Sequence, residues 1–402
     1  MIGHDDLARG GIDVGALDGI RVLDLTRYVA GPFATLALSD AGADVVKIEP
    51  PEGDTIRHFP STLKGGSRLF LGLNRGKRSL VVNLKKARGQ EIVRRMAQNA
   101  DIFIEGNRPG VIGKLGLDYE TLSKENSRLI YASVSAYGQK GPLSKRRGLD
   151  PILQTHAGIP SQQTEKGEPR LVQGHFVDYF TGSLTLGAVM LALFERERSG
   201  RGQYIDTSLL GSAAAMQLGR LVWASESEPI DQVRDALNDR IARIYDTADG
   251  QFYLYLDAEG FWERGLGVLG LEELNEDPEY STHLGRHADR DAIIEKVQAV
   301  LMAKSAEEWV ELFEAAGVPS AKVRPPSSLL EDEQMRAMGF LTQSVHPELG
   351  LLQMMGAPYV LPAASTREGA PPLLGEHTDM VLAGEGYKAS EIDALHQDGV
   401  VF

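Results

Sequence analysis

Short apolar runs alternate with amphipathic stretches along the first half of the chain. Each run is apolar at nearly every position, which is typical of a parallel strand covered by helices on both faces. Strands are therefore predicted at Arg21–Leu25, Asp44–Ile48, Ser79–Asn83, Asp101–Ile104 and Leu129–Val134. Helices are predicted between them, at Pro32–Ser39, Gly89–Asn99 and Tyr119–Glu125. This alternation predicts an α/β domain with a parallel sheet and right-handed crossovers.

The pattern changes further along the chain. A long apolar helix is predicted from Gly182 to Arg198, and a strand from Gln203 to Thr207. The stretch from about Ser225 to Val323 is acidic and predicts a second, smaller α+β domain, which we place at residues 225–329. Its predicted elements are a strand at Gln251–Leu256 and amphipathic helices at Arg290–Ala303 and Ala306–Ala316, and a last helix is expected at Ser390–Gln397 near the end of the chain.

Composition narrows the classes of function. The chain has 402 residues, a length that favours two domains. It contains no cysteine, which excludes disulfides, thiol catalysis and cysteine-bound metals, and fits a reducing compartment. The net charge of −14 argues against binding to nucleic acid or to a membrane surface. No window comes near the composition of a membrane span, the N-terminus lacks a signal-peptide layout, and no metal is expected. We therefore expect a cytoplasmic protein.

One glycine pattern is set aside. The segment Gly265–Gly270 matches the dinucleotide fingerprint, but its flanks are helical and no strand precedes it. The fingerprint binds pyrophosphate only at a strand-to-helix turn. Nicotinamide chemistry is therefore not expected.

Three features suggest a site for an anionic ligand. The turn Arg27–Pro32 follows the first strand and precedes a helix, a position where α/β sheets bind ligands. Basic residues gather around the other strands of this acidic chain, as a ligand with several phosphates requires. Asp178 precedes the predicted long helix; it is either a carboxylate favoured by the helix dipole or a nucleophile that the dipole keeps ionised. The basic residues are Arg75, Lys77, Arg78, Lys85, Lys86, Arg108, Lys114, Lys145, Arg146 and Arg147.

Many segments, in order along nearly the whole chain, resemble the family III CoA-transferases, the formyl-CoA transferase and carnitine CoA-transferase type. The matching segments are Leu23–Thr26, Ala30–Pro32, Gly42–Pro51, Gly53–Asp54, Leu73–Ser79, Arg108–Gly110, Leu115–Leu117, Ser133–Gly138, Gly200–Gln203 and Leu373–Asp379. The chain departs from many relatives at Glu105–Gly110, where Gly106-Asn107 replaces a pair that contains an aromatic residue.

The resemblance implies a fold and a reaction. The fold is a Rossmann-like large domain, here 1–224 completed by 330–402, plus the small domain, in an interlocked homodimer. The substrates are an acyl-CoA and a carboxylic acid, and no cofactor is bound permanently. Asp178 is implied to be the nucleophile, forming an acyl anhydride and then an aspartyl-CoA thioester. The residues implied to contact CoA, with Asp150 near the reactive end, are Tyr28, Val29, Ala30, Val82, Lys85, Arg108, Lys114, Arg147 and Asp150.

Two alternatives stay open. The α-methylacyl-CoA racemases resemble the chain throughout, but they use the histidine of a Gly-His-Asp motif, and this chain has Gly148-Leu149-Asp150. Leucine cannot exchange a proton with a substrate carbon, which favours transfer over isomerisation. The other alternative is a catalytically silent CoA-binding protein on the same scaffold, and the presence of Asp178 argues against it.

Overall fold

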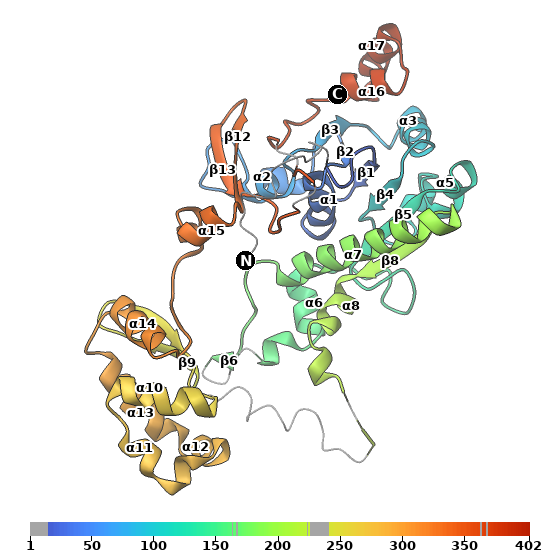
Figure 1. Cartoon of the computed structure of the whole chain (residues 1–402). Coiled ribbons are helices and arrows are strands. Elements are labelled where there is room, and N and C mark those ends of the chain that lie inside the picture. Colours follow the sequence, from blue (N-terminus) through green and yellow to red (C-terminus); the bar gives the residue numbers. More distant parts are fainter. Residues whose placement is uncertain are drawn as a thin grey trace. The chain divides into compact units, whose positions relative to one another are not determined.

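The first compact unit, Met1–Leu218 with Leu330–Phe402, is built on a six-stranded parallel sheet (Figure 1). The computed structural model describes residues 15–402 except 163, 166–167, 223, 226–240, 362–363 and 367–368. The strand order is β3-β2-β1-β4-β5-β8, so the chain leaves β1 in one direction to β2 and β3 and then returns to its other side. The strands are β1 (Arg21–Leu25), β2 (Asp44–Glu49), β3 (Arg78–Val81), β4 (Ile102–Glu105), β5 (Ile130–Ser135) and β8 (Tyr204–Ser208).

Helices cover both faces of this sheet because its strands alternate apolar side chains between two cores. Val22 belongs to one core and its neighbour Leu23 to the other. One face carries α1 (Ala30–Asp40), α6 (Asp150–His156), α7 (Phe176–Ser199) and α8 (Leu209–Ala215). The other carries α3 (Ala87–Ala97), α4 (Val111–Lys114), α5 (Tyr119–Glu125), α16 (Thr378–Gly384) and α17 (Ala389–Gln397). The predicted α/β class with a parallel sheet is confirmed.

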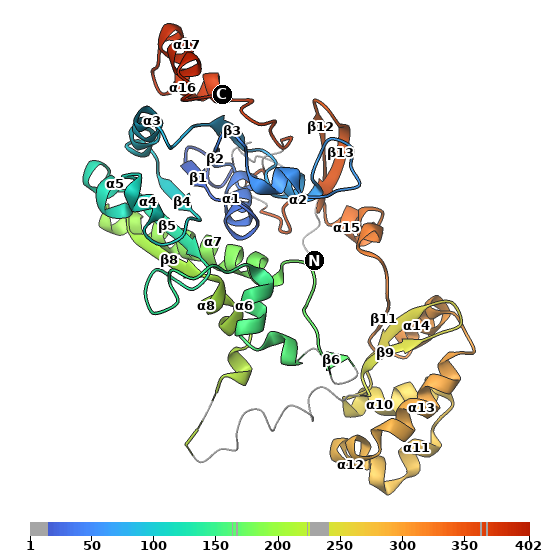
Figure 2. The ribbon, with the colours of Figure 1, turned by 180° about the vertical axis from the view of Figure 1, so that it is seen from behind.

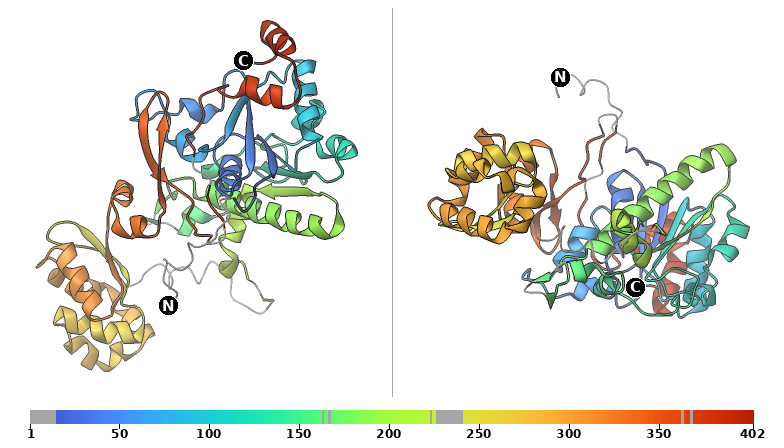
Figure 3. Two further views of the ribbon diagram at one scale, coloured as in Figure 1. Left: turned by 45° about the horizontal axis from the view of Figure 1, so that its top comes forward. Right: turned by 90° about the horizontal axis from the view of Figure 1, so that it is seen from below.

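The C-terminal segment packs on this domain, and Figure 3 shows its red helices beside the blue strands. The amide of His377 donates to the carbonyl of Ser79, and the Thr378 hydroxyl accepts from the amide of Val81. Val401 forms an isolated bridge with Val82. The remaining elements of this unit are η2 (Thr55–His58), α2 (Arg68–Leu73), η3 (Ile159–Gln162), β6 (Thr164–Glu165), β7 (Glu168–Pro169), η4 (Leu218–Arg220, which reaches into the second unit), α15 (Glu333–Ala337), β12 (Leu341–His346) and β13 (Gly350–Met355).

The long helix α7 differs from its prediction in two ways. It begins at Phe176, not Gly182, so Asp178 lies inside its first turn. It is also the one helix among the described residues that is long and apolar enough to span a membrane, with a mean hydropathy of 1.5, so the expectation that no window comes near such a composition is wrong. One side of α7 packs on α1, α6, α8, β5 and β8, and Figure 2 shows it along β8. The other side is exposed, since 39% of its apolar window is buried.

The second compact unit, Gly219–Leu329, has its own hydrophobic core around Trp262, Trp309 and Phe313. Its three-stranded antiparallel sheet has the order β11-β10-β9. Gly265–Gly270 lies in helix α10 and its C-cap, as the sequence indicated, and not at a strand-to-helix turn. The elements are β9 (Arg243–Asp246), β10 (Gln251–Leu254), α10 (Glu259–Leu269), α11 (Glu273–Glu276), η6 (Pro278–Ser281), α12 (His283–Ala288), α13 (Arg290–Leu301), α14 (Ala306–Ala315), β11 (Ser320–Lys322) and η7 (Pro326–Leu330, which ends in the first unit).

Candidate active site

The turn after β1 adopts a strained backbone conformation. Tyr28 has a φ of 67°, in the left-handed region that bulky side chains rarely occupy. Its amide donates to Oδ1 of Asp54 at 3.3 Å, and the next residue, Val29, is the N-cap of α1. A hydrogen bond from the strained residue to a fixed carboxylate opposes relaxation of the turn.

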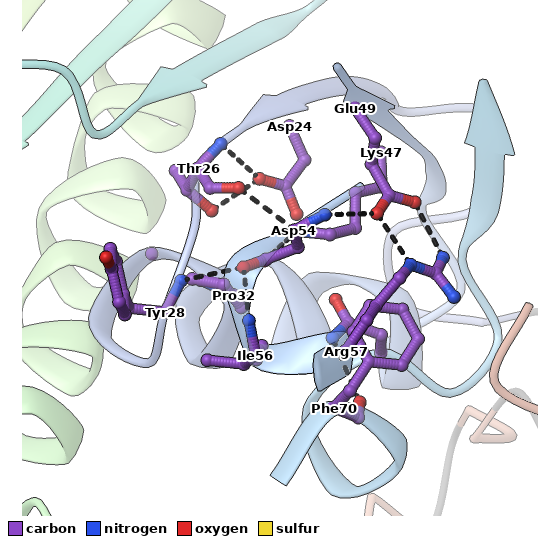
Figure 4. Close-up of polar contacts among 12 residues, drawn as sticks. Asp24, Thr26, Tyr28, Pro32, Lys47, Glu49, Asp54, Ile56, Arg57 and Phe70 are labelled. Carbon is purple, nitrogen blue, oxygen red and sulfur yellow. Dashed lines mark hydrogen bonds and ion pairs between the residues drawn. The ribbon is translucent and has the colours of Figure 1, made fainter. Parts of the chain in front are cut away.

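Asp54 is itself held by a buried ion pair (Figure 4). Its Oδ2 lies 2.9 Å from Nζ of Lys47, and neither side chain is exposed. Lys47 also donates to the carbonyl of Thr26 at 3.0 Å, one residue before the turn begins. Burial alone would lower the pKa of Lys47, but the charges of Asp24, Asp54 and Glu49 raise it above the ordinary lysine value. The ammonium is therefore charged and ties Asp54 to the end of β1.

A second buried pair lies beneath the start of α1. Nζ of Lys77 contacts Oδ2 of Asp24 at 3.1 Å and donates to the carbonyl of Pro32 at 2.9 Å. Asp24 also accepts from the hydroxyls of Thr26 and Thr35. Burial would raise the pKa of Asp24, but Lys77, Lys47 and these hydroxyls hold it far below its usual range. Burial lowers the pKa of Lys77 to about 8, with Asp24 opposing the shift.

Glu49 and Arg57 form a third pair in the same network (Figure 4). The guanidinium donates twice to the Glu49 carboxylate, each time at 2.7 Å, and lies over the Phe70 ring at 3.7 Å from its centroid. Glu49 also accepts from the amide of Asp54. The backbone of Asp54 is thereby fixed as well as its side chain.

Two carboxylates meet at the start of α7. The amide of Asp178 donates to Oδ2 of Asp150 at 3.0 Å, and Asp150, 2% exposed, also accepts from the amide side chain of Gln154 at 2.5 Å. On the other side, Nδ1 of His175 lies 3.7 Å from Oδ2 of Asp178, whose side chain is 13% exposed. His175 is the N-cap of α7 and has a φ of 61°.

The protonation of Asp178 follows from this setting. Burial, and then the negative charge of Asp150, raise the pKa of Asp178 to about 7. The expectation that this carboxylate is kept ionised is therefore wrong, because burial and the like charge of Asp150 favour its protonated form. A carboxylate with a pKa near neutrality is a stronger nucleophile than an ordinary aspartate once it is ionised, and such shifts gather at functional sites.

The start of α7 lies directly against the Tyr28 turn. A Cβ on Gly182 would come within 2.5 Å of the Ala30 carbonyl oxygen and 2.9 Å of the Phe33 ring, so only glycine permits this close crossing of α1 and α7. Tyr179 packs on a small apolar cluster that includes Val29, and its ring meets that of Phe33 edge-on at 5.1 Å. The turn and Asp178 thus belong to one packed region.

The other residues implied to bind CoA follow the carboxyl ends of strands in the same parallel sheet. Lys85 follows β3, Arg108 and Lys114 follow β4, and Arg147 follows β5; all four side chains are exposed. Because carboxyl ends of parallel strands share one edge, the topology brings Lys85 and Arg108, which closely follow β3 and β4, toward the edge that holds the Tyr28 turn. Lys114 lies at the end of α4 and Arg147 just before α6, so their position at this edge stays a prediction. The point between β1 and β4, where the chain changes direction across the sheet, lies at this edge.

Not every predicted residue presents its side chain there. Val82 is fully buried in the core, so a contact with a nucleotide would have to use its backbone. The basic residues Arg75 and Lys77 are buried in ion pairs and not available to a phosphate, and the partly exposed Arg78 is also paired, which corrects their assignment to the anion site. They pair with Asp40, Asp24 and Asp44, respectively.

No role in catalysis or binding was predicted for His175, Lys47 or Asp54. The latter two lie within matched motifs, but a pattern along the chain does not show that one carboxylate supports the amide of Tyr28. Among the described residues, no group of three or more acidic or histidine side chains is placed to hold a metal ion.

Comparison with known proteins decides the family. The profile of CoA-transferase family III matches residues 17–378. The chain belongs to CoA-transferase family III. This confirms the resemblance drawn from the sequence motifs, and the protein is an enzyme that transfers CoA, with CoA thioesters as substrates.

Individual members of CoA-transferase family III are similar over almost their whole length. Succinyl-CoA:glutarate CoA-transferase of Mus musculus is 32% identical, over 96% of this chain and 90% of its own. Acetyl-CoA:oxalate CoA-transferase of Acetobacter aceti is 33% identical, over 89% of this chain and 93% of its own. A CaiB/BaiF family crystal structure from Brucella suis has a TM-score of 0.81 and 29% identity, and covers 92% of this chain and all of that one (100%).

Proposed function

We propose that this CoA-transferase moves CoA from an acyl-CoA to a carboxylic acid by covalent catalysis on Asp178. The observation that carries the proposal is the environment of that carboxylate. It is nearly buried, its pKa is raised to about 7 by burial and by Asp150, and the next residue, Tyr179, packs on the cluster that includes Val29 of the Tyr28 turn. A carboxylate at this position has the basicity to attack a thioester near neutral pH.

The first half of the exchange loads CoA onto the enzyme. An oxygen of ionised Asp178 attacks the acyl carbon of the donor, the carbon–sulfur bond breaks, and CoA thiolate leaves a mixed anhydride. The thiolate then attacks the carbonyl carbon of Asp178. The donor acid departs as its carboxylate, and an aspartyl-CoA thioester remains.

The second half repeats these steps in reverse. The acceptor carboxylate attacks the aspartyl thioester, releasing CoA thiolate and forming a second anhydride. The thiolate attacks the acceptor's acyl carbon, which frees the Asp178 carboxylate and gives the new acyl-CoA. No net proton is taken up or released, so the reaction requires no separate acid or base. Splitting the exchange in this way replaces one difficult displacement by easier ones.

Trapping the intermediate tests this proposal. The enzyme is mixed with succinyl-CoA alone, treated with hydroxylamine, digested and analysed by mass spectrometry. We expect the hydroxamate on Asp178 only when donor is present. Asp178→Ala should bind CoA nearly as well as the native enzyme but lose both the modification and exchange. Modification of another residue, or exchange by Asp178→Ala, would overturn the proposal.

The isomerase alternative is tested by a different readout. Leu149, at the position of the racemase histidine, offers no proton-transferring group, and its side chain is 55% exposed. A 2-methylacyl-CoA incubated with the enzyme in heavy water should therefore keep its α-hydrogen. Uptake of deuterium at that carbon would support the racemase.

We also propose that the exposed lysines and arginines at the sheet edge bind the CoA phosphates, with Tyr28–Ala30 against the nucleotide. Their exposure in an enzyme with a net charge of −14 supports this assignment. Charge-reversal of one of them should raise the KM for acyl-CoA with little change in kcat, and added salt should do the same to the native enzyme. An unchanged KM would remove that residue from the binding site.

The assembly is proposed to be an interlocked homodimer in the cytoplasm. Support comes from an apolar face of α7 that the chain leaves open: Leu191 is 72% and Phe194 65% exposed. The absence of cysteine fits a reducing compartment. Size-exclusion chromatography with light-scattering detection should give twice the mass of one chain. A monomer at the concentration used in the assays would contradict the proposed assembly.

A further inference from the structure

A cleft of about 760 Å³ opens in the first unit, beside the residues already described. Its volume falls in the range of sites that hold small organic ligands. The walls come from the loop before α2, from the first turn of α2 and from the residue that caps α7. The lining residues are Phe59, Pro60, Ser61, Thr62, Ser67, Arg68, Leu69 and His175.

Two lining residues of the cleft lie next to residues of the candidate active site. His175 forms part of its wall and has Nδ1 3.7 Å from Oδ2 of Asp178. On the other side, the ring of Phe59 lies 6.4 Å from that of Tyr28, edge to face. An acyl group that is joined to Asp178 as an anhydride therefore has this cleft as the adjoining space.

The walls of the cleft combine apolar side chains with one positive charge. Phe59, Pro60 and Leu69 offer apolar surface that suits a methylene chain, and Arg68 supplies the only permanent charge among the lining residues. The hydroxyl of Ser61 accepts from backbone amides, and that of Ser67 caps α2. No carboxylate lines the cleft.

Arg68 is held in place without being neutralised. Its Nη1 donates to the hydroxyl of Thr62, and its amide donates to Oγ of Ser61 at 3.4 Å. Within the part of the chain that the structure describes, no carboxylate lies within ion-pairing distance of its guanidinium. A guanidinium with unused donors presents a planar fork that fits a carboxylate in two-point contact.

We propose that this cleft binds the acyl chain of the exchanging acid and that Arg68 pairs with a second carboxylate at its far end. The substrate class is then short dicarboxylic acids, one carboxylate reacting at Asp178 and the other held by Arg68. This assignment rests on the proposed function of Asp178. In an enzyme with a net charge of −14, a dianionic acid needs such a local cation to enter.

Acceptor selectivity tests the assignment. With succinyl-CoA saturating, kcat/KM for the acceptor reports only the second half of a double-displacement reaction. It is measured for glutarate and for pentanoate, which have equal chain length and differ in the distal carboxylate. The native enzyme should prefer glutarate. Arg68→Met should cut the glutarate value by about 10- to 100-fold, the effect of losing a charged hydrogen-bonded pair, and leave pentanoate unchanged.

Two further variants separate binding from structure. Arg68→Lys keeps the charge without the planar fork and should recover part of the glutarate activity. Lys64 is an exposed cation in the same loop that does not line the cleft. Lys64→Met should leave kcat/KM unchanged for both acids. Equal losses for both acids in Arg68→Met, or no loss for glutarate, would overturn the assignment of Arg68.

The same data distinguish the two proposals. If the native enzyme exchanges CoA and forms the Asp178 adduct but shows no preference for glutarate that depends on Arg68, only the dicarboxylate assignment fails. If no adduct forms on Asp178 with the native enzyme, the proposed function fails.

Discussion

At the scale of single residues, the pair Asp150 and Asp178 accounts for the reactivity we propose. Asp150 is nearly inaccessible and accepts hydrogen bonds from the Asp178 amide and from Gln154. It therefore orients the first turn of α7 and places a negative charge beside the nucleophile. Both effects act on Asp178: the hydrogen bond fixes its backbone, and the charge raises the pKa of its side chain.

The pH dependence of the reaction follows from that pKa. Because burial and Asp150 raise the pKa of Asp178 to about 7, and only the ionised form attacks, kcat/KM for acyl-CoA should rise with pH up to about 7 and level off above it. Asp150→Asn removes the neighbouring charge, so its profile should be shifted to lower pH. Initial rates over a pH series measure both profiles. A native profile that is flat from pH 5 to 8 would contradict the raised pKa.

The same shift predicts how the nucleophile affects stability. The folded pKa of Asp178, about 7, lies above the unfolded value of about 4, so folding favours the proton and ionisation destabilises the folded state as pH rises between them. Asp178→Asn removes this cost. Its gain in unfolding free energy should grow by on the order of 2 kcal/mol from pH 5 to pH 7 and stay constant above.

Urea unfolding at several pH values measures this gain. The exposed Asp393, changed to Asn, is the matched control and should show no such trend. An Asp178→Asn variant that is less stable than the native protein at pH 8 would show that the carboxylate is stabilised by its surroundings.

At the scale of elements, the crossing of α1 and α7 brings the Tyr28 turn to the helix that carries Asp178, the proposed nucleophile. The crossing depends on the missing side chain at Gly182, where a Cβ would meet the Ala30 carbonyl oxygen at 2.5 Å. A backbone atom cannot swing aside as a flexible side chain does, so the two helices must move apart to admit even a methyl group.

Two helix glycines, Gly182 in α7 and the exposed Gly267 in α10, make a matched comparison. Gly182→Ala should destabilise the protein by about 1–3 kcal/mol through overpacking and should lower kcat/KM, because it moves the turn. Gly267→Ala, where a Cβ meets nothing within 4 Å, should leave activity unchanged and stabilise by up to about 1 kcal/mol through helix propensity. Thermal unfolding and initial rates measure both. Equal behaviour of the two variants would refute the role of the crossing.

The carboxylate of Asp54 should matter for binding although it touches no substrate in this account. Asp54→Asn removes the ion-pair partner of the buried Lys47 and weakens the support of the Tyr28 amide. Because the charges of Asp24 and Glu49 remain, the cost should stay below about 3–5 kcal/mol, the cost of a fully unpaired buried charge. We expect a higher KM for acyl-CoA with a smaller change in kcat, measured on the fraction that remains folded. A fall in kcat alone would place Asp54 in the chemistry.

Much of the sheet could be predicted, since strands such as Arg21–Leu25 and the helix Tyr119–Glu125 follow directly from apolar periodicity. The start of α7 could not: His175 in the left-handed region and the Asp150–Asp178 contact come from residues far apart in the chain. The ion pairs of Arg75, Lys77 and Arg78 could not be predicted either. A sequence does not distinguish a basic residue that binds phosphate from one that pairs with an internal carboxylate.

At the scale of the whole molecule, the chain leaves the large unit after Leu218 and returns to it at Leu330. The returning segment completes a core: Val381, Leu382, Ile392 and Leu395 pack with residues of β1–β4 and α3. The final residues pair with the end of β3. The C-terminal helices are therefore part of the large unit and should fold cooperatively with it.

A pair of substitutions in α16 tests that cooperation. Leu382→Ala removes a fully buried side chain and should destabilise the large unit by about 2–5 kcal/mol. Met380→Ala, on the exposed side of the same helix, should stay within about 0.5 kcal/mol of the native protein. Hydrogen exchange in β1–β4 reports the effect. Unchanged protection of these strands in Leu382→Ala would show that the segment is not part of their folding unit.

The covalent role of Asp178 is tested most directly by following oxygen. An acceptor acid labelled with ¹⁸O in its carboxylate is given to the enzyme with unlabelled succinyl-CoA. If Asp178 acts as proposed, ¹⁸O passes from the acceptor to the side chain of Asp178 and, in later turnovers, into the released succinate. Exchange that proceeds while the peptide containing Asp178 and the succinate both stay unlabelled would contradict this role.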